Sequence, residues 1–229
     1  MVFELTPSGN GFTENVLYTF TGGNDGGTPF SGVISDAAGN LYGTATGGGA
    51  FGFGTVFELT GTGPSRTEQT LYSFQNGSDG NTPVGGLIFD ALGNLYGTTS
   101  SGGAGGGGTV FKLTPSGGGS FAFTLLFSFT NSTLLTGTGP QATLTMDAAG
   151  NIYGTTSRDG AFAQGSVFKL TPSGGGYTFT SLHDFTGGTD GGRPFSNVIF
   201  DAAGNLYGTT LNGGGTPGDM AGVVFEITP

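Results

Sequence analysis

The chain repeats itself about every 55 residues, and this internal period constrains its fold more than any other feature of the sequence. The string VFELT begins at Val2 and returns as VFELT, VFKLT, VFKLT and VFEIT at positions 56, 110, 167 and 224. The string DAAGNLYGT begins at Asp36 and returns with small changes at positions 90, 147 and 201. We divide this single repeat domain into repeats at 2–55, 56–109, 110–166 and 167–223, with an extra strand at 224–229. Periods of this length are typical of solenoids and propellers, because one unit cannot bury its apolar surface alone.

Each repeat contains short apolar runs separated by glycine or proline, which is the pattern of β-strands. In the second repeat we expect strands at residues 86–89, 94–99, 109–114 and 123–129. Glycine interrupts every window long enough for a helix. The Asp-Ala-Ala-Gly-Asn strings predict hairpin turns, because Asp accepts hydrogen bonds from turn amides and Gly supplies a positive φ. The sequence therefore predicts an all-β protein of four-stranded antiparallel sheets.

The second strand of each sheet is expected to be covered on both sides. In residues 94–99 neither face carries a charge, so neighbouring sheets must stack on both. Radial stacking of four-stranded antiparallel blades gives a β-propeller, with four repeats in this chain.

The order of the strands predicts how such a propeller closes. The first strands of the fourth blade lie near the C-terminal end, whereas its only available outer strand, residues 16–20, lies near the N-terminal end. We expect the N- and C-terminal strands to pair, as a four-bladed ring in one chain or an eight-bladed ring in a dimer. Of the strands at 2–6 and 224–228, one is then surplus and available for self-association.

Composition excludes several classes of function. Only 5 of 229 residues are Lys or Arg, and the net charge of −10 argues against a nucleic-acid partner. There is no cysteine, hence no disulfide or thiolate site. The most apolar run, 121–129, is far shorter than the ~20 residues of a membrane span. The first residues do not form a secretion signal, so an export signal would lie outside this chain.

The repeated strings also resemble a known family. VFELTP, LYTF, DGGTPF and DAAGNLYGT together resemble the GloVer tandem repeat of bacterial proteins over essentially the whole chain, and AAGNLYG is similar to the hairpin of NHL-type propellers. The resemblance implies an exported, surface-associated propeller of unassigned activity. The third repeat departs from the pattern, because residues 131–140 read NSTLLTGTGP where the others carry forms of GGNDGGTP.

Strand order places two sets of loops at one end of the sheets. The loops between second and third strands, at 47–54, 101–108, 157–165 and 211–222, differ strongly between repeats. Such variation is typical of a recognition surface, although a lack of constraint on glycine-rich loops explains it equally well. We expect any ligand or partner to contact this loop face, whose candidate residues are Asp25, Phe51, Phe53, Asp79, Arg158, Asp159, Phe162, Asp190, Arg193, Asp219 and Met220.

The repeated acidic residues are more easily explained by structure than by chemistry. We interpret one aspartate of each hairpin as a turn former: Asp36, Asp90, Asp147 and Asp201. Ca²⁺ is a minor alternative for Asp25, Asp79 and Asp190, because each of their loops offers one carboxylate where tight sites use several. No metal site or other cofactor is therefore predicted.

The only histidine and one charged position complete the candidates. His183 stands where other repeats have Tyr18, Tyr72 and Phe127, so we interpret it as a substituted aromatic residue and not as a catalytic one. One position of the third strand accepts either sign of charge, and we expect it to be partly exposed: Glu4, Glu58, Lys112, Lys169 and Glu226.

No nucleophile and base pair is evident, so the sequence favours a protein that is not an enzyme. We expect a non-enzymatic extracellular or cell-surface scaffold or assembly unit. A module that binds carbohydrate or another neutral ligand is the alternative, because Phe51, Phe53 and Phe162 could stack on sugar rings. A glycan-active enzyme using Asp159 and Asp219 comes third.

Overall fold

The computed structural model describes residues 1–64, 66–130, 138–158, 160–215 and 221–228. Within this part of the chain every regular element is a β-strand, which confirms the all-β prediction. No described segment is a helix long and apolar enough to cross a membrane.

The strands form antiparallel meanders. Three sheets have all four strands. Sheet I consists of β3 (Ile34–Ser35), β4 (Leu41–Ala45), β5 (Thr55–Thr60) and β6 (Thr67–Ser73). Sheet II consists of β7 (Ile88–Phe89), β8 (Leu95–Thr99), β9 (Gly106–Gly117) and β10 (Ser120–Thr130), and sheet III consists of β11 (Thr145–Met146), β12 (Ile152–Thr156), β13 (Ser166–Ser173) and β14 (Gly176–Asp184). The C-terminal sheet has β15 (Ile199–Phe200), β16 (Leu206–Thr210) and β17 (Val223–Ile227), and the N-terminal hairpin has β1 (Val2–Ser8) and β2 (Gly11–Tyr18).

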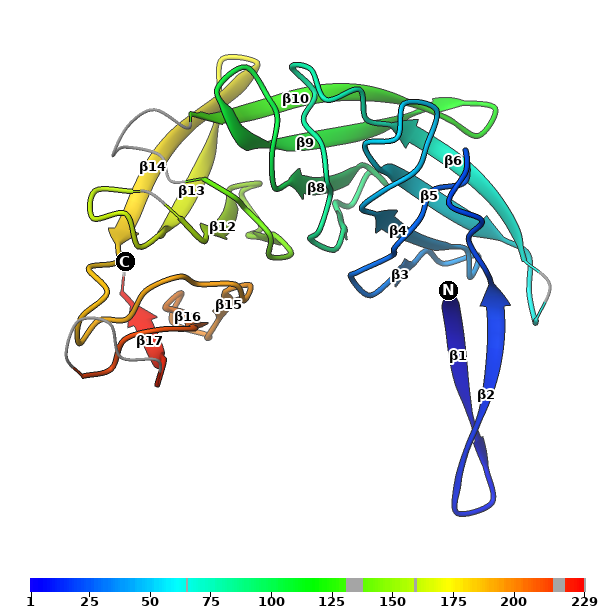
Figure 1. The fold of residues 1–229 in the computed structure, drawn as a ribbon, viewed down its shortest axis with the longest axis horizontal. Coiled ribbons are helices and arrows are strands. Elements are labelled where there is room, and N and C mark those ends of the chain that lie inside the picture. Colours follow the sequence, from blue (N-terminus) through cyan, green and yellow to red (C-terminus); the bar gives the residue numbers. More distant parts are fainter. Residues whose placement is uncertain (65, 131–137, 159, 216–220, 229) are drawn as a thin grey trace.

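The sheets follow one another around an arc, as the sequence period predicts (Figure 1). The strands of each complete sheet follow one another outward from the inside of the arc, as from β3 to β6, from β8 to β10 and from β12 to β14 (Figure 1). The hydrophobic core is divided among the interfaces between sheets. One cluster joins Val56 and Phe74 of the first sheet and its outer loop to Leu95 and Phe111 of the second, and sheets II and III share another.

In four of the sheets a phenylalanine ring packs against the glycine opposite it on the adjacent strand. Gly97 of β8 lies opposite Phe111 of β9, and a methyl group on Gly97 would lie 2.6 Å from the tip of that ring. The same pairing joins Gly43 to Phe57, Gly154 to Phe168 and Gly208 to Phe225. The glycine of the LYGT string therefore leaves the space that the phenylalanine ring of the next VF string occupies.

The two ends of the chain do not share a sheet. β2 pairs with β1 and β17 pairs with β16, in separate sheets, and the N- and C-termini lie on opposite sides of a gap in the arc (Figure 1). The expected pairing of N- and C-terminal strands is thus not present within the chain, and ring closure is not confirmed. In the structure the edge of β2 that strand counting assigned to the C-terminal sheet is taken by β1, which a short hairpin turn holds beside it.

Candidate functional site

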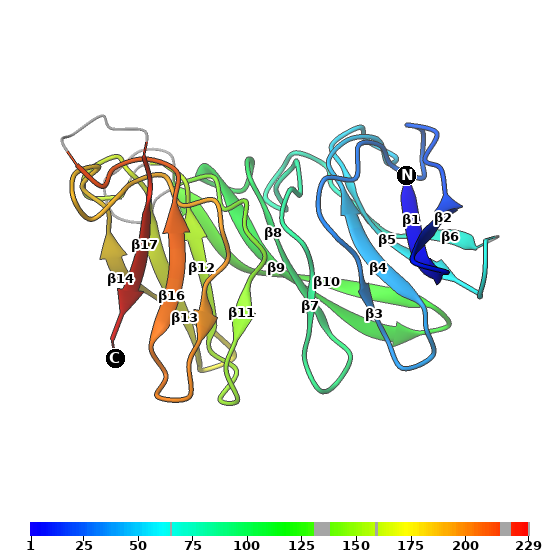
Figure 2. The same ribbon diagram turned by 90° about the horizontal axis from the view of Figure 1, so that it is seen from below.

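The two sets of loops do lie together at one end of the sheets. Figure 2 shows these loops on one side of the molecule and the Asp-Ala-Ala-Gly-Asn hairpins on the other. Within every repeat an isolated β-bridge joins the loop before the first strand to the loop after the second: Gly27 to Gly47, Asn81 to Ser101, Thr138 to Arg158 and Gly192 to Asn212. The predicted position of the loop face is therefore correct, while its role in binding stays a prediction.

The variable loops are fixed at their last residue. The amide of Thr82 donates to the carbonyl of Phe53 in the preceding loop at 3.0 Å. Gly108 has φ +97°, and a methyl group there would lie 2.2 Å from the Thr99 carbonyl oxygen and 2.9 Å from Pro140. Gly54 and Gly165 have equivalent contacts with the proline of the next repeat. Sequence variation in these loops is thus confined to the residues before this glycine.

The loop aspartates bind the outer strand of their own repeat. Asp79 accepts hydrogen bonds from the Gln75 amide at 2.8 Å and the Tyr72 hydroxyl at 3.1 Å. Asp25 accepts the same two kinds of bond, from the Thr21 amide at 2.8 Å and the Tyr18 hydroxyl at 3.1 Å. Burial, followed by the charge of Asp79 and its hydrogen bond, raises the pKa of Tyr72 to about 12. These carboxylates are engaged in holding their loops.

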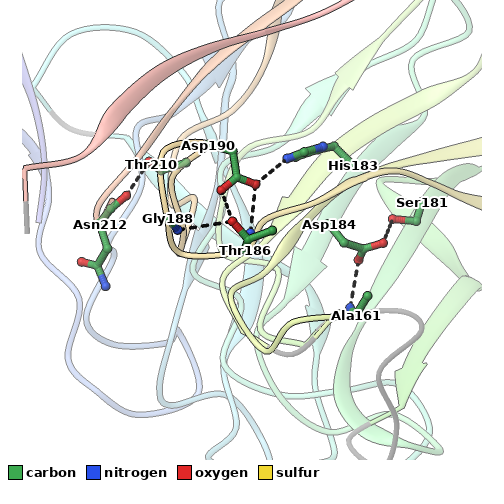
Figure 3. A network of polar contacts seen from close by, with 9 residues as sticks. All are labelled: Ala161, Ser181, His183, Asp184, Thr186, Gly188, Asp190, Thr210 and Asn212. Carbon is green, nitrogen blue, oxygen red and sulfur yellow. Dashed lines mark hydrogen bonds and ion pairs between the residues drawn. The ribbon is translucent and has the colours of Figure 1, made fainter. Parts of the chain in front are cut away.

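In the fourth repeat, His183 contacts the loop aspartate where the first two repeats have a tyrosine (Figure 3). Its Nε2 lies 3.1 Å from the Asp190 carboxylate, which also accepts the Thr186 amide at 2.9 Å and the Thr186 hydroxyl (Figure 3). Burial alone would raise the pKa of Asp190, but these hydrogen bonds outweigh it and lower the pKa. The interpretation of His183 as a replaced aromatic residue is confirmed. In the third repeat, the loop string lacks aspartate and the strand residue is Phe127, which has no hydroxyl to donate.

At the opposite end, each hairpin aspartate closes its own turn. The Asp147 Oδ1 accepts the amides of Ala149 at 3.0 Å and Asn151 at 2.9 Å, and Oδ2 accepts the Asn151 side chain at 2.7 Å and the Tyr153 hydroxyl at 3.1 Å. Desolvation opposes ionisation of Asp147, yet this set of donors lowers its pKa. Asp36, Asp90 and Asp201 make the same bonds, and the prediction of turn formers is confirmed.

The tyrosine of the LYGT string accommodates either charge on the third strand. Tyr42 donates to Glu58 at 2.8 Å, whereas the ammonium of Lys112 lies 5.8 Å from the centre of the Tyr96 ring. The expectation of partial exposure holds for Lys112 but is wrong for Glu58, which is buried. Its carboxylate is able to leave water because the Tyr42 hydroxyl replaces a hydrogen bond lost with the solvent.

The remaining described candidates on the loop face do not form one cluster. Phe51 and Phe53 are exposed on one loop and Phe162 on another, and Arg193 lies over the Phe195 ring at 5.7 Å. Arg158 lines a polar cavity of about 260 Å³ with Ser100, Thr138 and Gln141. Asp159, Asp219 and Met220 lie outside the described residues.

Sequence reasoning missed a cavity on the inside of the arc. It has a volume of about 300 Å³ and is lined by the segment that precedes the first strand in all four repeats, at 30–32, 84–86, 141–143 and 195–197. We call it the axial cavity. The sequence signal was present, because each segment follows the loop proline, but only the fold brings the four copies together.

No metal-binding arrangement is evident in the described ranges. No group of three or more His, Asp or Glu side chains gathers there in a position to hold a metal ion. The aspartates considered for Ca²⁺ direct their oxygens to donors of their own loops.

Comparison with known proteins agrees with the fold and the repeats. A structure of a protein of unknown function from Dyadobacter fermentans is similar to this chain, with 13% sequence identity and a TM-score of 0.50. The alignment covers 85% of this chain and 64% of that one, so this chain spans less than two thirds of its length. No curated protein matches the chain. Residues 1–225 match the model of the Gloeobacter/Verrucomicrobia repeat, and the chain therefore belongs to this repeat family.

Proposed function

We propose that this chain is a non-enzymatic structural module of a bacterial extracellular or cell-surface protein. In this proposal the stacked sheets are the blades of an NHL-like propeller, and its incomplete end sheets join by strand pairing. The single observation that carries the proposal is the complementarity of the two ends. The N-terminal hairpin corresponds to the third and fourth strands of a complete sheet, and the C-terminal sheet corresponds to the first three.

The strands at the two ends have equivalent sequences. β1 and the end of the chain around β17 carry VFELT and VFEIT. β1 already pairs with β2 in the register that joins third and fourth strands elsewhere, with Glu4 opposite Asn15 as Glu58 is opposite Gln69. β2 therefore suits the outer edge of β17, and in the joined form it exchanges β1 for β17.

Side-chain packing supports the same match. Phe12 in β2 lies opposite Pro7, as Tyr177 lies opposite Pro172 in sheet III. Tyr177 packs into the core between sheets II and III, whereas Phe12 is 69% exposed. A cavity of about 190 Å³ at the C-terminal sheet offers the corresponding surroundings, with a lining that includes Tyr153, Leu182, Phe200 and Ile227.

The non-enzymatic part of the proposal rests on how the acidic residues are used. The aspartates that recur in the repeats accept two or more hydrogen bonds from their own turn or loop. Carboxylates held in this way stabilise loops and are poorly placed for acid or base chemistry on a ligand. The surface location rests on the family resemblance, and fractionation of cells that produce the protein tests it.

Hydrogen exchange tests the joining of the ends. If a strand covers β17, the amides of residues 223–227 will be protected in the full chain, and Phe12→Ala will speed their exchange. Phe51→Ala, which truncates an exposed aromatic ring outside the end strands, is the matched control and should leave that exchange unchanged. Rapid exchange of the outward amides of β17 in the unaltered protein would refute the proposal.

A further inference from the structure

No Asp, Glu, His, Lys or Arg side chain lines the axial cavity. The lining consists of Phe30, Phe195, Val84, small residues and the neutral polar residues Ser31, Gln141, Thr143, Ser196 and Asn197. The cation beside this lining is Arg193, whose guanidinium lies 5.7 Å from the centre of the Phe195 ring. A cationic ligand would meet no carboxylate there.

Hydrogen bonds between repeats hold the four segments in place. The Thr44 hydroxyl of β4 donates to the Gly85 carbonyl of the next repeat at 3.1 Å, and the Thr155 hydroxyl of β12 donates to the Ser196 carbonyl at 3.0 Å. Gly85 itself is needed for this close approach, since a methyl group there would lie 2.6 Å from the Ala142 carbonyl oxygen. The cavity wall is therefore set by the stacking of the sheets, and a ligand would not have to order it.

Two aromatic rings stand at this cavity with much of their surface open to solvent. Phe30 is 74% exposed and Phe195 is 37% exposed. They come from the first and fourth repeats, where the residue after the loop proline is aromatic, whereas the second and third repeats have Val84 and Gln141. Exposed rings beside a cavity offer a flat apolar surface that a ligand with an apolar face would cover.

Two amide side chains in the lining have unused hydrogen-bonding groups. Among the described residues, the side chains of Gln141 and Asn197 have no hydrogen-bond partner, and each has both a donor and an acceptor. By contrast, Ser31 and Ser196 are engaged with Thr44 and Thr209. Free amides beside exposed rings suit a ligand that has hydroxyl groups around an apolar ring face.

We propose that the axial cavity binds a neutral carbohydrate, with Phe30 and Phe195 stacking on a pyranose ring and Gln141 and Asn197 bonding its hydroxyl groups. The volume of about 300 Å³ is at the lower end of ligand pockets, which favours the end or a short stretch of a sugar chain over a large ligand. This site differs from the variable loops, because Phe51, Phe53 and Phe162 do not line the axial cavity.

The experiment titrates the protein of residues 1–229 with neutral hexasaccharides of glucose, mannose, xylose and N-acetylglucosamine, using calorimetry and ligand-observed NMR. We expect saturable binding of at least one of them. Phe30→Ala and Phe195→Ala together should weaken it by about tenfold or more, the scale expected for lost aromatic stacking. Gln141→Ala with Asn197→Ala should weaken it as well. Leu92→Ala, which truncates an exposed side chain in a hairpin turn at the opposite end of the sheets and outside the cavity lining, should leave it unchanged, and the melting temperatures of all variants are measured to confirm folding.

Three results would overturn the proposal. The first is the absence of saturable binding by every neutral sugar at millimolar concentration. The second is unchanged affinity in the variant that lacks both Phe30 and Phe195. The third is tighter binding of oligogalacturonate than of a neutral hexasaccharide, because Arg193 beside Phe195 would then select an acid and the proposed ligand class would be wrong. The proposed joining of the end strands is tested by hydrogen exchange of β17, so either proposal can fail without the other.

Discussion

Replacing Gly97 by alanine tests whether the core phenylalanine on the adjacent strand needs a glycine opposite it. The added methyl group would lie 2.6 Å from the tip of the Phe111 ring and 2.9 Å from Leu87. Both neighbours are fully buried, so neither has free space to move into. Overpacking of this kind costs about 1–3 kcal/mol, and the lower entropy of the unfolded alanine variant offsets about 0.4–1 kcal/mol of it.

We therefore expect Gly97→Ala to lower the free energy of unfolding by about 1–2 kcal/mol, measured by urea denaturation. Gly176→Ala is the matched control, since it also lies in a strand and its methyl group would approach nothing closer than 3.9 Å. Adding Phe111→Leu to Gly97→Ala should cost less than the sum of the single changes, because the shorter side chain vacates the contested space. Unchanged stability of Gly97→Ala, or strict additivity in the double variant, would refute the reasoning.

Four further predictions concern the loops, the hairpin turns and the outer strands. Gly108→Ala should destabilise the fold by about 3 kcal/mol, since it combines a strained positive φ with a backbone clash; Gly47→Ala is its control, and equal denaturation midpoints would contradict the account. Below pH 3.8, stability should fall as Asp90, Asp147 and Asp190 become protonated, because their folded pKa values are lowered from that value and their stabilisation exists only above it. Between pH 10 and 12 stability should fall again, because the pKa of Tyr72 is raised to about 12 and its stabilisation exists only below the unfolded value; a flat profile from pH 2 to 12 would contradict both. His183→Phe should lower the free energy of unfolding by about 1 kcal/mol and raise the pKa of Asp190, because it removes a hydrogen bond to that carboxylate. His183→Tyr should retain the bond. Identical Asp190 titrations by NMR in the two variants would count against this role of His183.

Much of the fold could be predicted because each repeat contains the apolar runs and turn residues that specify its own strands and hairpins. The expected strands at 94–99 and 123–129 correspond to β8 and β10, and the hairpin aspartates act as the turn chemistry predicts. The equivalence of His183 with Tyr18 and Tyr72 could also be predicted, because register is preserved from repeat to repeat.

The axial cavity and the arrangement of the ends could not be predicted in the same way. The cavity depends on how far each sheet rotates relative to the next, and that angle results from packing between sheets that no single repeat encodes. The buried position of Glu58 was missed because its partner, Tyr42, lies on the neighbouring strand. Strand counting assigned β2 a partner in the C-terminal sheet, whereas in the structure its partner is β1.

An engineered pair of cysteines tests the joining of the ends most directly, because the natural chain has no cysteine. Asn15 and Glu226 would become register partners if β2 lay on β17, as Asn15 is now the partner of Glu4. Opposed residues of antiparallel strands have Cα atoms about 4.5–5.5 Å apart, within the range of a disulfide. Under mild oxidation, Asn15→Cys with Glu226→Cys should form a disulfide efficiently, giving a cyclic monomer or a covalent dimer on a denaturing gel according to which chain supplies β2. Failure to crosslink beyond the level of Asn15→Cys alone would contradict the account.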